Sequence, residues 1–232
     1  MAWENADETP QRQPREQAGE AARRQAREAL RRAILSGDVA PGQRLVEADL
    51  SSMFQVTRAS ARAALMDLTA EGLVERIPNR GARVRVVTQD EAVAITECRM
   101  VLEGLCAAKA AERVTDEQIA QLTRLREEMT RAAAEPLKYS ALNHELHRLV
   151  REFSGQHVAA NLLERLNAQL VRHQFQLSMR PGRMRVSMPE HLAIIDAVVD
   201  RDPARAEEAA RQHLRSVISA LASVDQDGTR LG

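Results

Sequence analysis

The chain has 232 residues, of which 44% are hydrophobic and 28% charged, and its 33 basic side chains balance its 33 acidic ones. This composition is that of a folded protein of one or two domains, and it excludes fibrous and wholly disordered chains. The chain has no apolar run near the ~18 residues of a membrane span and no export signal, so we expect a cytoplasmic protein without a membrane partner.

The beginning of the chain predicts a tail followed by a helix. Residues 1–18 mix charged, polar and proline residues without an apolar period, which indicates a flexible tail. From residue 19 to residue 36, apolar side chains recur at helical spacing. Gly37 follows, and a glycine at this position is typical of a helix end.

Two further helices and a hairpin follow. A short helix is predicted over 47–54 and a longer one over 58–71, separated by only three residues. Thr57 is placed to cap the second of them. Alternating residues over 73–77 and 82–87 predict two strands joined by a tight turn. Helix, turn, helix and hairpin together indicate a winged helix-turn-helix domain over residues 19–88, with a small two-stranded wing.

The rest of the chain predicts helices only. The expected spans are 89–113, 115–134, 136–153, 157–178, 184–200 and 203–222. Six amphipathic helices with short connections indicate an all-α bundle over 89–222, and residues 223–232 are expected to fray. The fold class is therefore mainly α, a winged helix-turn-helix followed by a helical bundle.

The zero net charge is the sum of different net charges on these parts of the chain. Residues 20–88 contain 12 arginines against 8 acidic side chains, an excess of +4, whereas residues 89–232 carry an excess of −2. A basic N-terminal domain on a neutral body suits a protein that binds nucleic acid through its first domain.

The candidate DNA-binding residues lie at the start of the second helix of the motif and at the hairpin tip. They are Thr57, Arg58, Ser60, Arg62, Arg80 and Gly81. Helix-turn-helix proteins place the first turn of this helix against base edges in the major groove, where an arginine fork matches guanine. The N-terminus of this helix, together with Thr57, favours binding of a phosphate. At the hairpin tip, the positive charge of Arg80 and the absence of a side chain at Gly81 favour contact with the DNA backbone. The alternative is that the two arginines of the helix form only a solvated face.

This N-terminal region resembles the GntR family of transcriptional regulators. The resemblance is carried by residues 33–45, 56–65, 71–74 and 78–84, and it covers about residues 20–88. It implies double-stranded DNA as partner, with Arg58 and Arg62 as the base-reading arginines and Gly81 as the wing glycine.

Histidines are concentrated in the second half of the chain. Asn143 and His147 are four residues apart on one predicted helix, while His191 and His213 lie on two others. Three imidazoles and one amide that meet inside a bundle could bind a divalent transition metal. Spacing alone also allows these residues to be ordinary core or surface side chains.

The C-terminal half resembles the FCD ligand-binding domain of the FadR subfamily, and six helices suit its VanR-like branch. The matching stretches are Arg99–Glu103, Asn143–His147, Glu190–His191 and His213–Leu214. The resemblance implies that Asn143, His147, His191 and His213 bind a metal such as zinc or nickel. It also implies a small carboxylate effector. Asn143 stands where the family usually has Asp, so an anionic effector would have to supply the missing charge.

Two arginines are candidates for the effector site, because a buried arginine needs an anion. They are Arg99 and Arg172, and the alternative for Arg99 is an internal salt bridge with Glu103. We therefore expect a homodimeric transcriptional repressor, not an enzyme, that reads a near-palindromic operator under effector control. One alternative is a metal-free sensor with the same DNA-binding domain. The other is an α-helical metalloenzyme, which is less favoured because the sequence shows no positioned general base.

Overall fold

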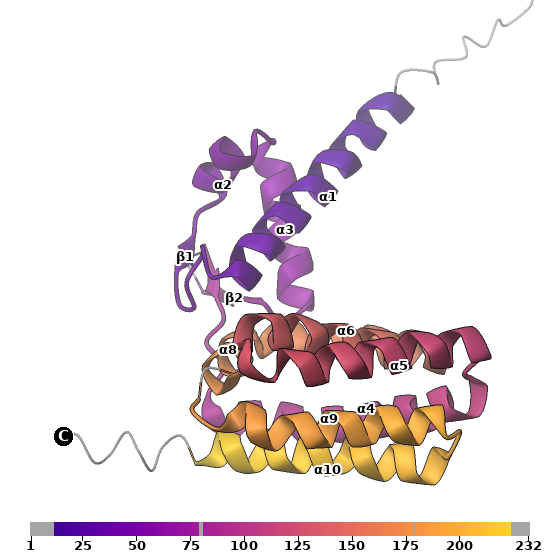
Figure 1. Ribbon diagram of the computed structural model, residues 1–232. Coiled ribbons are helices and arrows are strands. Elements are labelled where there is room, and N and C mark those ends of the chain that lie inside the picture. The colour runs from indigo at the N-terminus through magenta and orange to yellow at the C-terminus, as the bar shows by residue number, and fades with distance from the viewer. Residues whose placement is uncertain (1–11, 79–80, 179, 224–232) are drawn as a thin grey trace, which may run out of the picture. The chain divides into compact units, whose positions relative to one another are not determined.

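A computed structural model of the protein describes residues 12–78, 81–178 and 180–223. The chain divides into two compact units, Met1–Val86 and Val87–Gly232, called here the N-terminal and the C-terminal unit. Figure 1 shows the elements of each unit. The mainly α fold class is confirmed, because helices make up most of both units.

The N-terminal unit has the expected order of elements with one addition. In chain order it contains α1 (Arg12–Ser36), β1 (Arg44–Leu45), α2 (Glu47–Phe54), α3 (Arg58–Ala70), β2 (Val74–Ile77) and β3 (Gly81–Val84). The apolar stripe of α3 is buried, and it includes Ala61, Ala64, Leu65 and Leu68. Ala26 and Leu30 of α1 are buried as well, and α1 packs along α3.

The expectation of a flexible tail up to residue 18 is wrong for its last part. The first helix begins at Arg12, seven residues before the predicted start at Gly19. Residues 12–18 have no apolar period, but most of them are good helix formers, and the proline among them lies in the first turn, where proline is tolerated. Residues 1–11 lie outside the described ranges.

The wing is a three-stranded antiparallel sheet in the order β1-β3-β2. The predicted two-stranded wing therefore lacked one strand, β1. Arg44 of β1 pairs with Arg83, and Val74 of β2 pairs with Val84. The strand β1 has only two residues, and it exists because β3 offers it a free edge. Such a short segment gives no alternation from which a strand could be predicted.

The C-terminal unit is entirely helical in its described residues. It contains α4 (Gln89–Arg113), α5 (Asp116–Arg131), the 3₁₀ turn η1 (Ala132–Ala134), α6 (Pro136–Ser154), α7 (His157–Gln169), α8 (Val171–Ser178), α9 (Arg183–Val199) and α10 (Pro203–Ala222). The expectation of six helices is wrong for residues 157–178, where the chain forms two helices. The break falls at Leu170, which is itself buried.

Local capping and a shared core hold this bundle together. Thr115 and Gln118 form a capping box at the start of α5, and Asp202 caps α10 ahead of Pro203. Figure 1 shows α9 and α10 side by side, and α4 packs extensively on α10. The largest fully buried side chains of the bundle are mostly leucine, with isoleucine, methionine and His191 beside them; Leu122, Met129, Leu146, Leu163 and Ile195 are examples.

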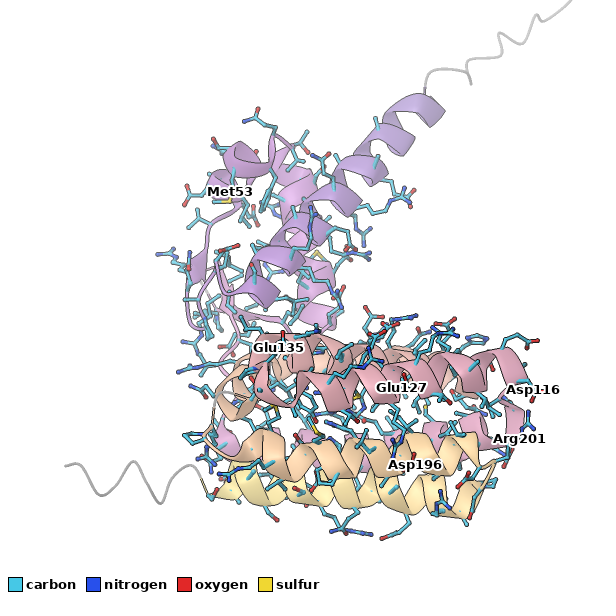
Figure 2. All side chains as sticks on the ribbon, in the orientation of Figure 1. Met53, Asp116, Glu127, Glu135, Asp196 and Arg201 are labelled. Carbon is cyan, nitrogen blue, oxygen red and sulfur yellow. The ribbon has the colours of Figure 1, made fainter. Side chains whose placement is uncertain are left out.

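Ion pairs tie the surfaces of these helices. Arg201, just after α9, donates to Asp116 at the start of α5 over 2.8 Å, and Figure 2 shows the two side chains at the same end of the bundle. Across the described ranges, no helix combines the length with the apolar composition needed to cross a membrane.

Candidate functional site

The helix α3 begins with the cap that the sequence predicts. Thr57 precedes it, and its Oγ1 accepts a hydrogen bond from the backbone N–H of Ser60 at 3.1 Å. The hydroxyl of Ser60 lies 3.0 Å from the same oxygen, and Ser60 is buried. Ser60, one of the candidate DNA-binding residues, therefore completes the cap from the inside of the helix instead of lying on the exposed surface.

The two arginines of α3 are exposed, as expected for a DNA-facing surface, but they differ in their partners. Arg62 is paired with Glu47 of α2: its Nε donates to one carboxylate oxygen at 2.8 Å and its Nη2 to the other at 2.7 Å. This pair lowers the pKa of Glu47, so the carboxylate stays ionised. Among the described residues, no ion pair is found for Arg58.

A groove runs between α3 and the wing, and arginines dominate its charged side chains. Arg44, Arg58, Arg62 and Arg76 line it, together with Glu47 and Gly81. Gly81 has a φ of +90°, which favours glycine over any residue with a Cβ. Arg80, the other candidate at the hairpin tip, lies outside the described residues. The groove is a concave, cationic surface beside the capped end of α3.

Three histidines from three helices converge in the C-terminal unit. His147 lies on α6, His191 on α9 and His213 on α10, and one nitrogen from each ring lies within 4.8 Å of the other two. The Nε2 atoms of His191 and His213 are 3.2 Å apart. Burial lowers the pKa of both, most strongly for His191, so both imidazoles are held neutral and can act as ligands.

The opposite nitrogen of each ring has a partner of its own. Nδ1 of His147 lies 3.1 Å from Glu103, and Nδ1 of His213 lies 2.9 Å from Glu190. Nδ1 of His191 lies 2.7 Å from the hydroxyl of Tyr139, which in turn contacts Ser187. A metal-binding histidine usually donates its second N–H to such a group, which fixes the tautomer and aims the other nitrogen at the metal.

Asn143 supplies a further feature that fits a metal. It lies one turn before His147 on α6, and its Oδ1 is buried without a hydrogen-bond partner among the described residues. A buried oxygen without a partner is costly unless something else binds it. Three imidazole nitrogens and one amide oxygen match the donor types that divalent transition metals accept.

The two arginines predicted for an effector have different surroundings. Arg99 is buried, and its Nε and Nη2 both donate to Glu103 at 3.0 and 2.8 Å. The internal salt bridge is therefore formed, and it occupies Arg99. Although burial alone would raise the pKa of Glu103, Arg99 and His147 lower it strongly. Arg172 is exposed on α8, whereas His191 and His213 are buried.

Two partly buried arginines near the histidine cluster, Arg183 and Arg151, were not predicted from the sequence. Arg183 is nearly buried at the start of α9, donates to Ser216 at 2.7 Å and lies 3.6 Å from Glu190. Its spacing from His191, two helical turns on the same helix, could have indicated it. Arg151 lines a small cavity with His147 and Glu103. Burial lowers the pKa of both arginines, so each would gain from an added anion.

A capped helix beside a cationic wing, followed by a bundle with a histidine cluster, defines the class of DNA-binding regulators with a ligand-binding domain. Two family models match the chain in this order. The model of bacterial regulatory proteins of the gntR family covers residues 22–84, and that of the FCD domain covers residues 94–216. The chain belongs to the GntR family and carries an FCD domain, so it is a transcription regulator and not an enzyme.

Relatives along nearly the whole chain agree with this assignment. The transcriptional repressor RspR of Escherichia coli K12 is 26% identical, over 86% of this chain and 89% of its own. The repressor NanR of Klebsiella aerogenes is 31% identical, over 81% of this chain and 80% of its own.

Solved structures share the fold. McbR/YncC of E. coli has a TM-score of 0.70 at 19% identity, over 87% of this chain and 97% of its own. A GntR regulator from Rhodococcus sp. RHA1 has a TM-score of 0.66 at 22% identity, over 88% of this chain and 99% of its own.

Proposed function

We propose that this protein is a transcriptional repressor whose affinity for its operator is controlled by a small carboxylate bound beside a divalent metal in the C-terminal unit. The observation that carries this proposal is the convergence of His147, His191 and His213 with a partner on each Nδ1. Such an arrangement turns the inner nitrogens of the rings toward one another, where a metal can bind them.

The proposed metal ligands are the three inner histidine nitrogens and Oδ1 of Asn143. A bound metal such as zinc or nickel supplies a positive centre with open positions that a carboxylate can fill. The protein's part is to orient the three imidazoles through Glu103, Tyr139 and Glu190, while burial keeps those of His191 and His213 neutral.

The charges around the cluster favour an anionic effector. Imidazole and amide ligands bring no negative charge to a metal. The negative charge of Glu103 is offset by Arg99, and Glu190 lies 3.6 Å from Arg183. A dication would therefore keep most of its charge, which an effector carboxylate can balance. In place of Arg99 and Arg172, we propose Arg183 and Arg151 as the cations that stabilise this carboxylate. Their burial beside the histidine cluster supports this choice.

The proposed DNA surface consists of the capped end of α3 and the wing. Arg58 and Arg62 would reach base edges, Thr57 and the helix N-terminus a phosphate, and Gly81 would let the wing approach the DNA backbone. We propose a homodimer that reads a near-palindromic operator, since the twofold symmetry of a dimer matches that of a palindrome. Gene regulation of this bacterial kind supports a cytoplasmic location.

Metal analysis of the purified protein tests the proposed site. Wild-type protein incubated with zinc and then desalted should retain the metal, whereas His147→Ala combined with His191→Ala should retain none. His157→Ala is the matched control, because His157 is exposed at the start of α7 and lies outside the cluster. Equal zinc retention by wild type and double variant would rule out this site.

A further inference from the structure

The pair between Glu47 and Arg62 has a geometry that matters for reading DNA. Glu47 is the first residue of α2 and Arg62 lies in the second turn of α3, so the bond joins the two helices of the motif. Both carboxylate oxygens are used, one by Nε at 2.8 Å and the other by Nη2 at 2.7 Å. This two-point contact fixes the plane of the guanidinium as well as its position.

The pair leaves half of the guanidinium free. An arginine has five N–H donors, and the edge that carries Nε is the one bound to Glu47. The other edge, formed by Nη1 and the second hydrogen of Nη2, keeps two parallel donors. The side chain of Arg62 is 62% exposed, and it lines the groove between α3 and the wing. Two parallel donors are what O6 and N7 of guanine accept in the major groove.

Arg58 provides a contrast on the same helix. It is exposed and lines the same groove, but no ion pair orients it among the residues that the structure describes. A free arginine must lose side-chain entropy when it binds a base, whereas a pre-oriented one has already lost much of it. The two arginines are therefore not equivalent as readers of a base.

We propose that Glu47 is a positioning residue for DNA recognition: it holds Arg62 with its free edge toward the major groove, so that this pair selects guanine. The inference rests on the proposed role of α3 in DNA binding. This role explains why an acidic residue, Glu47, lies on a surface lined by Arg44, Arg58, Arg62 and Arg76. Glu47 itself repels phosphate, so it should lower sequence-independent affinity while it raises selectivity.

These opposite effects separate positioning from simple electrostatics. The experiment is a selection of bound sequences from a randomised duplex library with the full-length protein, followed by affinity measurements on selected and scrambled duplexes. The variants are Glu47→Gln, which keeps the size and removes the charge, and Arg62→Ala. The matched control is Asp49→Asn, because Asp49 is exposed on the same helix and its change alters the net charge equally.

We expect Glu47→Gln and Arg62→Ala to lose the preference for guanine at the same position of each half-site, by roughly tenfold against the other bases. Glu47→Gln should also bind scrambled duplex at least as well as wild type, and Asp49→Asn should keep the guanine preference. Thermal unfolding verifies that each variant is folded. If Glu47→Gln enriches the same sequences as wild type with the same preference, Glu47 does not position Arg62. A wild type that enriches no sequence overturns the proposed reading by α3 and the role of Glu47 together.

Discussion

Nε2 of His191 lies 3.2 Å from Nε2 of His213, although the residues are 22 positions apart and belong to different helices. Each ring is turned by a contact at its other nitrogen, to Tyr139 for His191 and to Glu190 for His213. The two rings therefore face one another because their outer partners set their tautomers and orientations, and His147 completes the cluster.

Zinc should raise the melting temperature of the wild-type protein. A ligand present at about 100 times its dissociation constant stabilises the folded state by about 2.7 kcal/mol, provided that it does not bind the unfolded chain. The rise should vanish in His213→Ala and persist in His157→Ala, measured by differential scanning fluorimetry with and without zinc. A zinc-dependent rise of equal size in His213→Ala would contradict the assignment of this ligand.

Asn143→Asp should tighten zinc binding. The substitution places a negative charge where an uncharged oxygen without a hydrogen-bond partner now lies, and we expect an affinity gain of roughly tenfold or more. Calorimetric titration with zinc, at matched ionic strength with and without acetate, measures it. Acetate should improve zinc binding more in wild type than in Asn143→Asp, since the variant already supplies an anion. An equal acetate effect in both proteins would show that Asn143 does not set this dependence.

Arg58→Ala and Arg62→Ala should each weaken specific DNA binding. A lost base contact costs about 1–3 kcal/mol and relaxes specificity at one position, whereas a lost phosphate contact weakens binding to all sequences alike. Fluorescence anisotropy with a selected duplex and a scrambled one, over a range of salt concentrations, distinguishes the two cases. Near-wild-type affinity of both variants for the selected duplex would remove α3 from the recognition surface.

Two glycine substitutions should change stability in opposite directions. Gly81 has a φ of +90°, so Gly81→Ala should destabilise the N-terminal unit by about 1–2 kcal/mol. Gly19 lies inside α1 with no atom within 4 Å of an added Cβ, so Gly19→Ala should stabilise by roughly 0.5–1 kcal/mol. Chemical denaturation measures both, and a Gly81→Ala protein as stable as wild type would show that the wing adjusts without strain.

Glu103→Gln should destabilise the C-terminal unit far more than Glu112→Gln on the same helix. Glu103 is buried and holds both Arg99 and His147, and removal of one partner of a buried pair costs roughly 3–5 kcal/mol. Glu112 is exposed and pairs with Lys109 on the surface, where such pairs contribute at most about 1 kcal/mol. Denaturation of both variants tests this difference, and similar losses would mean that water reaches Arg99.

Local signals in the sequence were enough to predict most of the helices and the types of residue at both sites. The bounds of α2 and the start of α3 at Arg58 were predicted correctly, the latter from the capping residue Thr57, because a side-chain cap involves residues within one turn. The same local rules missed β1, which depends on pairing with β3. They also missed the break at Leu170, where the amphipathic pattern continues without glycine or proline.

The order of residues alone shows which chemical groups are available: arginines at the start of α3, and histidines on three helices of the second half. Which of these groups meet depends on how the helices pack. The tertiary structure paired Arg62 of α3 with Glu47 of α2, brought His191 and His213 together, and placed Arg183 of α9 beside Ser216 of α10. The physical reason is that side-chain partners between helices depend on packing and burial over long separations, and these have no local signature in the chain.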